Sequence, residues 1–113
     1  MEIEYFKNKR GNCEILDFMA SLKDENQQKA ILKGLDKLKD YNFSDLLKVQ
    51  IVEKIGKNLY ELRCHYGKTI FRVLFGLIEG GIFVSVVFQK KEQKLKKGEM
   101  NLAIKRIKER VNI

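Results

Sequence analysis

The fold is decided by residues 59–66, which read Leu59-Tyr60-Glu61-Leu62-Arg63-Cys64-His65-Tyr66. Apolar and charged or polar residues alternate there, as in a half-buried β-strand, and residues 69–78 answer with Phe71, Val73, Phe75 and Leu77 on one face and Arg72 on the other. If Gly67-Lys68 is a two-residue turn, Tyr66 pairs with Thr69, and one face of the hairpin becomes wholly apolar. The sequence therefore predicts an antiparallel hairpin over residues 59–78.

The same register places Arg63 directly opposite Arg72 on the other face. Like charges that face each other across a ladder are destabilising, so an anion between them is expected. Glu61 could be that anion, and a nucleic-acid phosphate could be another. Removing either arginine should leave stability nearly unchanged or improved, because it relieves this repulsion. The alternative is that these are solvated side chains on the open face of an antiparallel sheet.

A second hairpin extends this pattern to a third strand. Gly80-Gly81 is a strong signal for a tight turn. Pairing Glu79 with Ile82 brings Gln89 beside Arg72. Arg63, Arg72 and Gln89 would then form a row across three strands, with Lys91 one pleat beyond Gln89.

The remaining chain predicts helices around this sheet. A short strand is expected at Ile3 and Tyr5, another over residues 49–55, and a polar connection over residues 42–48. Helices are expected over residues 13–23, from a cap at Asp24 to about residue 41, and over residues 97–110. The first helix should turn five side chains inward: Ile15, Leu16, Phe18, Met19 and Leu22. We therefore predict one α+β domain, residues 1–113, with a twisted, mainly antiparallel sheet, two N-terminal helices on one face and a C-terminal helix, with the helices on the apolar face of the sheet.

Charge is unevenly distributed along the chain. Residues 1–45 carry 8 Lys/Arg and 9 Asp/Glu, net −1, whereas residues 46–113 carry 15 and 6, net +9. The basic half favours a polyanionic partner such as RNA, or an acidic protein. Cys13 and Cys64 fit neither a zinc site nor a disulfide framework, and we expect reduced thiols. The first residues lack the order of a signal peptide and no apolar run reaches about 20 residues, so we expect a cytoplasmic protein without a membrane partner.

These motifs, in this order, resemble the RelE/HigB superfamily of bacterial toxins, in particular its phage-derived, HigB-like branch. The matching positions cover nearly the whole chain: Gly11, Phe18, Leu22, Leu59 to Arg63, Phe71 to Leu74, Phe88, Lys90, Lys91, Gln93, Lys94, Glu99 and Ala103. The resemblance implies the toxin of a type II toxin–antitoxin system. It implies a ribosome-dependent endoribonuclease that cuts translated mRNA, and a helix-turn-helix antitoxin whose complex with the toxin could bind operator DNA.

The residue types suit RNA cleavage by the 2′-hydroxyl, which requires no metal or cofactor but needs a base, an acid and cations for the phosphorane. The candidate catalytic residues are Arg63, Arg72, Lys90, Lys91 and Glu61. The candidate RNA-binding residues are Lys94, Lys96, Lys97, Gln89, Gln93, His65 and Tyr66. Lys90 or Lys91 could be the base, and Glu61 could be either the base or the counter-ion of the arginines. His65 could take one proton-transfer role or be a solvated strand-end residue, and Tyr66 could stack on a base.

Two departures from the family pattern bear on activity. Glu92 stands where a Thr or Ser is usual, and the chain has no proline where one often follows. A carboxylate beside the phosphate site opposes activity, although Lys94, Lys96 and Lys97 could offset it. The alternative function is a decayed toxin or a non-catalytic basic module that binds RNA or DNA through phosphate contacts.

Overall fold

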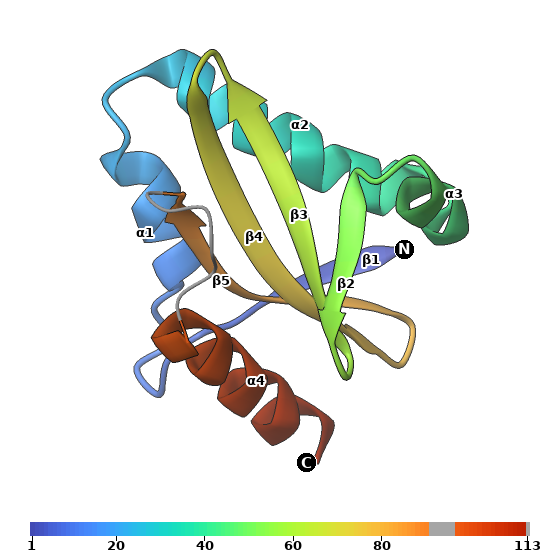
Figure 1. The fold of residues 1–113 in the computed structure, drawn as a ribbon. Coiled ribbons are helices and arrows are strands. Elements are labelled where there is room, and N and C mark those ends of the chain that lie inside the picture. The colour runs from blue at the N-terminus through green and yellow to red at the C-terminus, as the bar shows by residue number, and fades with distance from the viewer. Residues whose placement is uncertain (91–96, 113) are drawn as a thin grey trace.

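A computed structural model describes residues 1–90 and 97–112 of the chain (Figure 1). In order, its elements are β1 (Glu2–Tyr5), α1 (Glu14–Ser21), α2 (Glu25–Asp40), α3 (Phe43–Lys48), β2 (Val52–Gly56), β3 (Leu59–Tyr66), β4 (Thr69–Ile78), β5 (Gly81–Gln89) and α4 (Lys97–Val111). The strands form one sheet in the order β1-β5-β4-β3-β2. Three pairings are antiparallel, and β1 joins β5 in parallel. The predicted α+β class with a mainly antiparallel sheet is confirmed.

Helices cover both faces of the sheet. Figure 1 shows α2 behind the sheet and α4 in front of it. The larger core lies on the α1–α3 side and contains Phe71, Phe75 and Leu62, while a second core forms where Ala103 and Ile107 of α4 meet the sheet. The N-terminal helices therefore lie on the apolar face as predicted, but α4 covers the other face. That face also carries the charged residues of the central strands.

The β3–β4 hairpin has the predicted register throughout. Tyr66 pairs with Thr69, and Arg63 lies opposite Arg72. Gly67 has a φ of 59°, as a tight hairpin turn requires. The two-residue turn and the apolar face thus determine the register in which β3 pairs with β4.

Two local predictions were wrong. Leu16 is 51% exposed, because only Ile15 and Met19 of α1 are buried against the core. Residues 43–48 form α3 rather than a polar connection, and the side chain of Asn42 caps this helix by accepting a hydrogen bond from the Asp45 N–H. Short polar sequences with a good N-cap can form a helix once one side chain, here Leu46, is buried.

The end of α3 has a Schellman motif, which sets the path of the chain into β2. The Ile51 N–H donates to the Leu46 carbonyl, and the Gln50 N–H donates to the Leu47 carbonyl. Gln50 therefore occupies the position that glycine usually takes, with a φ of 61°. This bend brings the chain into the sheet only at Val52, opposite Leu62.

Replacing Gln50 with glycine should raise the free energy of unfolding by about 0.5–1 kcal/mol, because the left-handed conformation costs an ordinary L-residue roughly 1 kcal/mol and glycine adopts it freely. Denaturant unfolding measures this. Asn58 is the contrasting position: its φ is 47°, but its amide exchanges two hydrogen bonds with the backbone of Leu77. Asn58→Gly should therefore lower the free energy of unfolding. If Asn58→Gly raised this free energy and Gln50→Gly lowered it, the left-handed conformation would not explain the effect.

Candidate functional site

Four charged side chains from three adjacent strands meet on the face of the sheet that α4 also covers. Arg63 Nε donates to Glu61 Oε1 at 2.6 Å, and Arg63 Nη2 donates to Glu53 Oε2 at 2.7 Å. The second oxygen of Glu61, Oε2, lies 3.3 Å from Nη1 of Arg72. We call Glu53, Glu61, Arg63 and Arg72 the Glu61 cluster. Its carboxylates and guanidinium groups alternate, so the facing arginines share an anion.

Burial differs sharply within the Glu61 cluster. The side chain of Glu61 is 2% exposed and that of Arg72 is 5% exposed, whereas Arg63 is 43% exposed. A buried carboxylate needs partners for both oxygens, and the two arginines supply them. For Arg72, this contact with a buried carboxylate argues against the expectation that removing either arginine would leave stability unchanged or improved. Of the cluster's two cations, Arg63 is the one open to a ligand.

The third strand does not have the predicted register. Phe88, rather than Gln89, lies opposite Arg72, while Gln89 pairs with Phe71 and belongs to the opposite face. A bulge at Ser85 causes the shift, because Leu74 pairs with Val86 while Phe75 pairs with Val84. The prediction that Arg63, Arg72 and Gln89 form a row across three strands is therefore wrong. The third member of the row is Phe88, which packs with the α4 core.

The bulged residue, Ser85, is also the point at which α4 contacts β5 through hydrogen bonds. Ser85 is completely buried, and its hydroxyl donates to the Ala103 carbonyl of α4 at 3.1 Å. The Ser85 carbonyl accepts a hydrogen bond from Arg106 at 3.0 Å. Arg106 also forms an ion pair with Glu14 and lies over the ring of Phe6 at 3.8 Å. Ser85, the extra residue in β5, thus contacts α4 through both its hydroxyl and its backbone carbonyl.

Lys90 lies on the same face as Arg72. Its N–H donates to the Ile70 carbonyl at 2.7 Å, which continues the β4–β5 ladder by one residue. Ile70 in turn pairs with His65 of β3, so His65, Ile70 and Lys90 form the next row of this face. Lys90 is half-buried and His65 is exposed. The structure thus brings Lys90 and His65 to the face of the Glu61 cluster.

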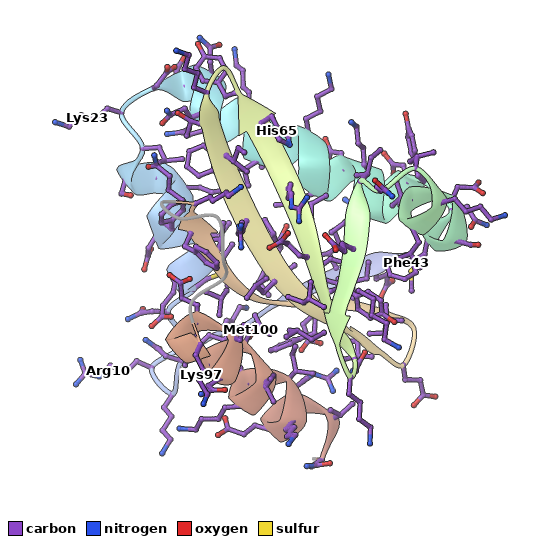
Figure 2. All side chains as sticks on the ribbon, in the orientation of Figure 1. Arg10, Lys23, Phe43, His65, Lys97 and Met100 are labelled. Atoms are coloured by element: carbon purple, nitrogen blue, oxygen red, sulfur yellow. The ribbon has the colours of Figure 1, made fainter. Side chains whose placement is uncertain are left out.

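The other candidate residues are placed differently. Tyr66 is 38% exposed and faces the α2 side, as its pairing with Thr69 and the alternation from Cys64 require. Lys97 is exposed at the first residue of α4, and Figure 2 shows it and Met100 at that helix start, whereas His65 lies toward the β3–β4 turn. Lys91, Gln93, Lys94 and Lys96, together with Glu92, lie outside the described residues.

Arg110 ties the end of α4 to the first strand. Its guanidinium forms a bidentate pair with Glu4 at 2.5 and 3.0 Å. The hydrogen bond from Arg110 lowers the pKa of Glu4, so this contact contributes stability above the ordinary carboxyl pKa and loses it as the pH falls through the lowered value. Neither this pair nor the Glu53 contact was predicted from the sequence. Alternation alone does not reveal the latter, because an irregularity between Lys54 and Gly56 shifts the β2–β3 register.

Other chemistry in the described residues is limited. Burial raises the pKa of the Cys64 thiol to about 12, so this thiol is a packing group and not a nucleophile. Within residues 1–90 and 97–112, no three His, Cys, Asp or Glu side chains are grouped so that they could hold a metal ion. In the same ranges, no helix has the length and apolar character to span a membrane.

The fold and this face define the class: a small α+β protein with an ionic cluster on the central strands of its sheet. The family model described as "Phage derived protein Gp49-like (DUF891)" matches residues 17–108, from α1 into α4, and the chain belongs to this family. The family is toxin-like, which is consistent with a toxin role and implies an antitoxin partner in general terms. No curated protein matches the chain.

Proposed function

We propose that this protein is the RelE/HigB-like toxin of a type II toxin–antitoxin system and acts as a ribosome-dependent endoribonuclease on translated mRNA. The observation that carries the proposal is the Glu61 cluster: a buried carboxylate holds two arginines on a face that also presents Lys90 and His65. Membership of a toxin-like family supports the biological role. The cytoplasm, where ribosomes and mRNA are found, is the proposed location.

In the proposed reaction, the 2′-oxygen of one nucleotide attacks the adjacent phosphorus. The bond from phosphorus to the 5′-oxygen breaks, and the products are a 2′,3′-cyclic phosphate and a 5′-hydroxyl. A base takes the 2′-hydroxyl proton, an acid protonates the 5′-oxygen, and cations stabilise the extra charge on the phosphorane. The protein residues supply these functions, so no cofactor enters the reaction.

The geometry favours particular roles within the cluster. Glu61 is proposed as the counter-ion that fixes the arginines, because both of its oxygens already accept guanidinium contacts and its side chain is buried. Arg63 is proposed to contact the scissile phosphate, since nearly half of its side chain is exposed. Lys90 is the described candidate for the base, and His65 is a candidate for the acid. Lys91 remains the second candidate base, and Lys94, Lys96, Lys97 and Gln93 remain proposed RNA contacts.

The proposed partners follow from this role. A helix-turn-helix antitoxin would hold the toxin inactive, and the ribosome would present the mRNA substrate. The complex with the antitoxin would bind operator DNA. Opposite charge would accelerate association with an acidic partner, because the chain carries a formal net charge of +8.

Induced expression should arrest growth, and mRNAs should be cut only when they are translated. Primer extension on a reporter mRNA measures the cuts, and the same reporter with its start codon removed is the control. Cuts in the first reporter alone support the proposal. Intact reporters with unimpaired growth would contradict it.

One observation favours the alternative of a non-catalytic nucleic-acid-binding module. Two carboxylates offset the two arginines of the Glu61 cluster, and the side chain of Arg72 is almost completely buried. A surface that only binds phosphates would rely on exposed lysines and Arg63. The protein would then bind RNA with a strong salt dependence but leave it intact.

A further inference from the structure

Part of the outer edge of β3 has no neighbouring strand within the described residues. β3 pairs with β4 as far as Tyr66, but its pairing with β2 ends at Leu62. The Schellman motif at Gln50 explains this, because it directs the chain away from the ladder just before Val52. Residues 63–66 therefore belong to an open strand edge, which covers about 13 Å at roughly 3.3 Å per residue.

The backbone groups on this edge are oriented for strand pairing. Tyr66 and Thr69 flank a two-residue turn, so they form a hydrogen-bonded pair of the β3–β4 ladder. Because such pairs alternate along an antiparallel ladder, Cys64 also bonds toward β4, whereas Arg63 and His65 direct their N–H and C=O groups to the other side. The Arg63 N–H there faces Ile51, the residue before β2, because Val52 pairs with Leu62. An added strand would thus meet the N–H of His65 and the C=O groups of Arg63 and His65.

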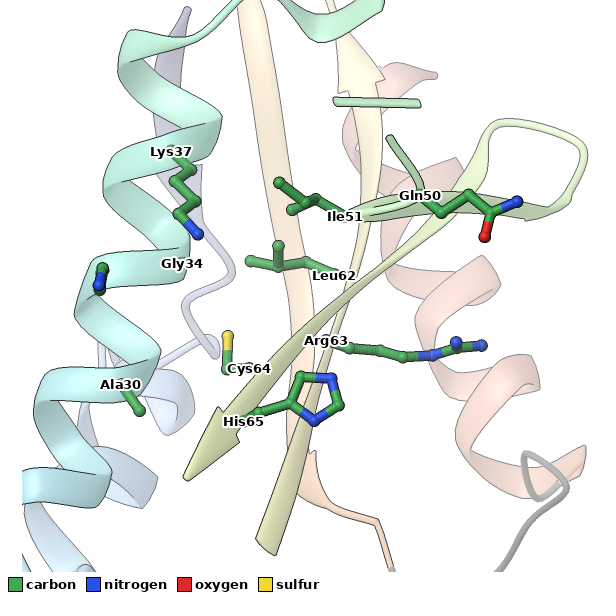
Figure 3. A pocket seen from close by; sticks show the side chains of 10 residues that line it. Ala30, Gly34, Lys37, Gln50, Ile51, Leu62, Arg63, Cys64 and His65 are labelled. Atoms are coloured by element: carbon green, nitrogen blue, oxygen red, sulfur yellow. The ribbon is translucent and has the colours of Figure 1, made fainter. Parts of the chain in front are cut away.

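A groove of about 330 Å³ runs along this edge between β3 and α2 (Figure 3). Gly34 allows the close approach of the helix, since a Cβ at this position would lie 2.5 Å from Cys64 Sγ. Figure 3 shows Lys37 directed toward the groove, while Arg63 extends away from α2 on the other side of the strand. A strand placed here would therefore have one row of side chains beside α2 and the other beside Arg63 and His65.

The groove itself is lined by cationic or neutral groups. The described residues that line the groove include Lys33, Lys37, Arg63 and His65, and no aspartate or glutamate is among them. Lys68, in the turn at the end of the edge, is exposed. Electrostatic complementarity therefore favours an acidic segment over a basic one. Backbone pairing favours an extended polypeptide over RNA, which has no equivalent ladder of peptide groups.

We propose that an extended acidic segment of a partner protein binds in this groove and pairs with Arg63 and His65 as an additional strand of the sheet. The proposal does not depend on the nuclease activity. It uses the backbone edge of β3 and the groove beside α2, and the outer row of the added strand would lie next to Arg63 of the Glu61 cluster. The segment would span about four to six residues. It would be tethered to a larger partner, because so short a ladder binds weakly by itself.

The test uses a designed hexapeptide in which glutamate and threonine alternate, with blocked ends, and measures its binding to the full chain by calorimetry and NMR. We expect binding that weakens as salt rises. The same peptide with N-methyl groups on alternate amides should bind at least tenfold more weakly, as should a version with lysine in place of glutamate. Equal binding of the N-methylated peptide would overturn strand addition, since charge alone would then explain the affinity.

Protein variants provide a matched comparison on the edge itself. His65→Pro removes one outward-facing N–H without removing a β3–β4 hydrogen bond, and proline is tolerated at such edge positions. His65→Pro should lose peptide binding at least tenfold, while His65→Ala should retain it. Charge reversal at Lys33 and Lys37 should also weaken binding, with Lys105→Glu on α4 as the control. If His65→Pro does not fold, the N-methylated peptide still decides the question.

Two further outcomes would overturn the proposal. An RNA oligonucleotide that displaces the peptide, and that loses affinity in the Lys33 and Lys37 variants, would identify the groove as a nucleic-acid site. Self-association of the wild-type chain that His65→Pro abolishes, without peptide binding, would show that a second copy occupies the edge.

Discussion

Glu61→Gln should lower the free energy of unfolding by about 3 kcal/mol, which corresponds to a fall in melting temperature of more than about 10 °C. The substitution keeps the size of the side chain but removes the charge that both guanidinium groups contact. Arg63 and Arg72 would then face each other across the ladder without the carboxylate between them. Thermal and denaturant unfolding of the purified variant measure the loss.

Glu53→Gln is the matched control for this substitution. Glu53 contacts the same guanidinium as Glu61, at 2.7 Å, but its side chain is 54% exposed. Exposed ion pairs contribute at most about 1 kcal/mol, so this variant should remain close to the wild type. Similar losses in both variants would show that burial of Glu61 is not the source of its effect.

Arg63→Ala should reduce RNA cleavage about tenfold to 100-fold, if the proposed function is correct. Removing one preorganised donor to transition-state charge costs roughly 100-fold in enclosed sites, and the partial exposure of Arg63 favours the lower part of the range. Cleavage of a translated reporter mRNA by purified protein and ribosomes measures the rate. The melting temperature, measured in parallel, separates a loss of activity from a loss of folded protein.

Arg110→Ala is the appropriate control for the Arg63 experiment. The side chain of Arg110 is 38% exposed and pairs with a carboxylate, as Arg63 does, but it lies on α4 and contacts Glu4. Both substitutions change the net charge equally, so a general effect on attraction to RNA would affect both. Equal loss of cleavage in the two variants would mean that Arg63 contributes only long-range charge.

The central hairpin was predictable from the sequence because local chemistry determines it. The turn at Gly67-Lys68 and the sequence on either side predict a register in which one face of the hairpin is wholly apolar, and the structure has that register. The placement of Arg63 opposite Arg72 followed directly. The facing arginines require an anion, and Glu61 of the same strand contacts both of them.

The third strand was not predictable in the same way. The bulge at Ser85 shifts Phe88 into the place expected for Gln89, and the bulge is associated with contacts to Ala103 and Arg106, which are distant in sequence. Alternation within β5 contains no signal for such a contact. The same limitation applies to Glu53, which reaches Arg63 only because the β2–β3 pairing is irregular. The roles of Lys91, Gln93, Lys94 and Lys96 stay predictions.

The attachment of α4 has a consequence for how the protein is made. Arg110 contacts Glu4, 106 positions earlier, and Arg106 contacts Glu14, 92 positions earlier. These contacts form only after the chain through Arg110 has been synthesised, and contacts between such distant residues form slowly because a long loop must close. A nascent chain that has not yet reached Arg110 therefore lacks the contacts by which α4 completes the second core. The second core forms later in synthesis than the β3–β4 hairpin, whose partners are adjacent in the sequence.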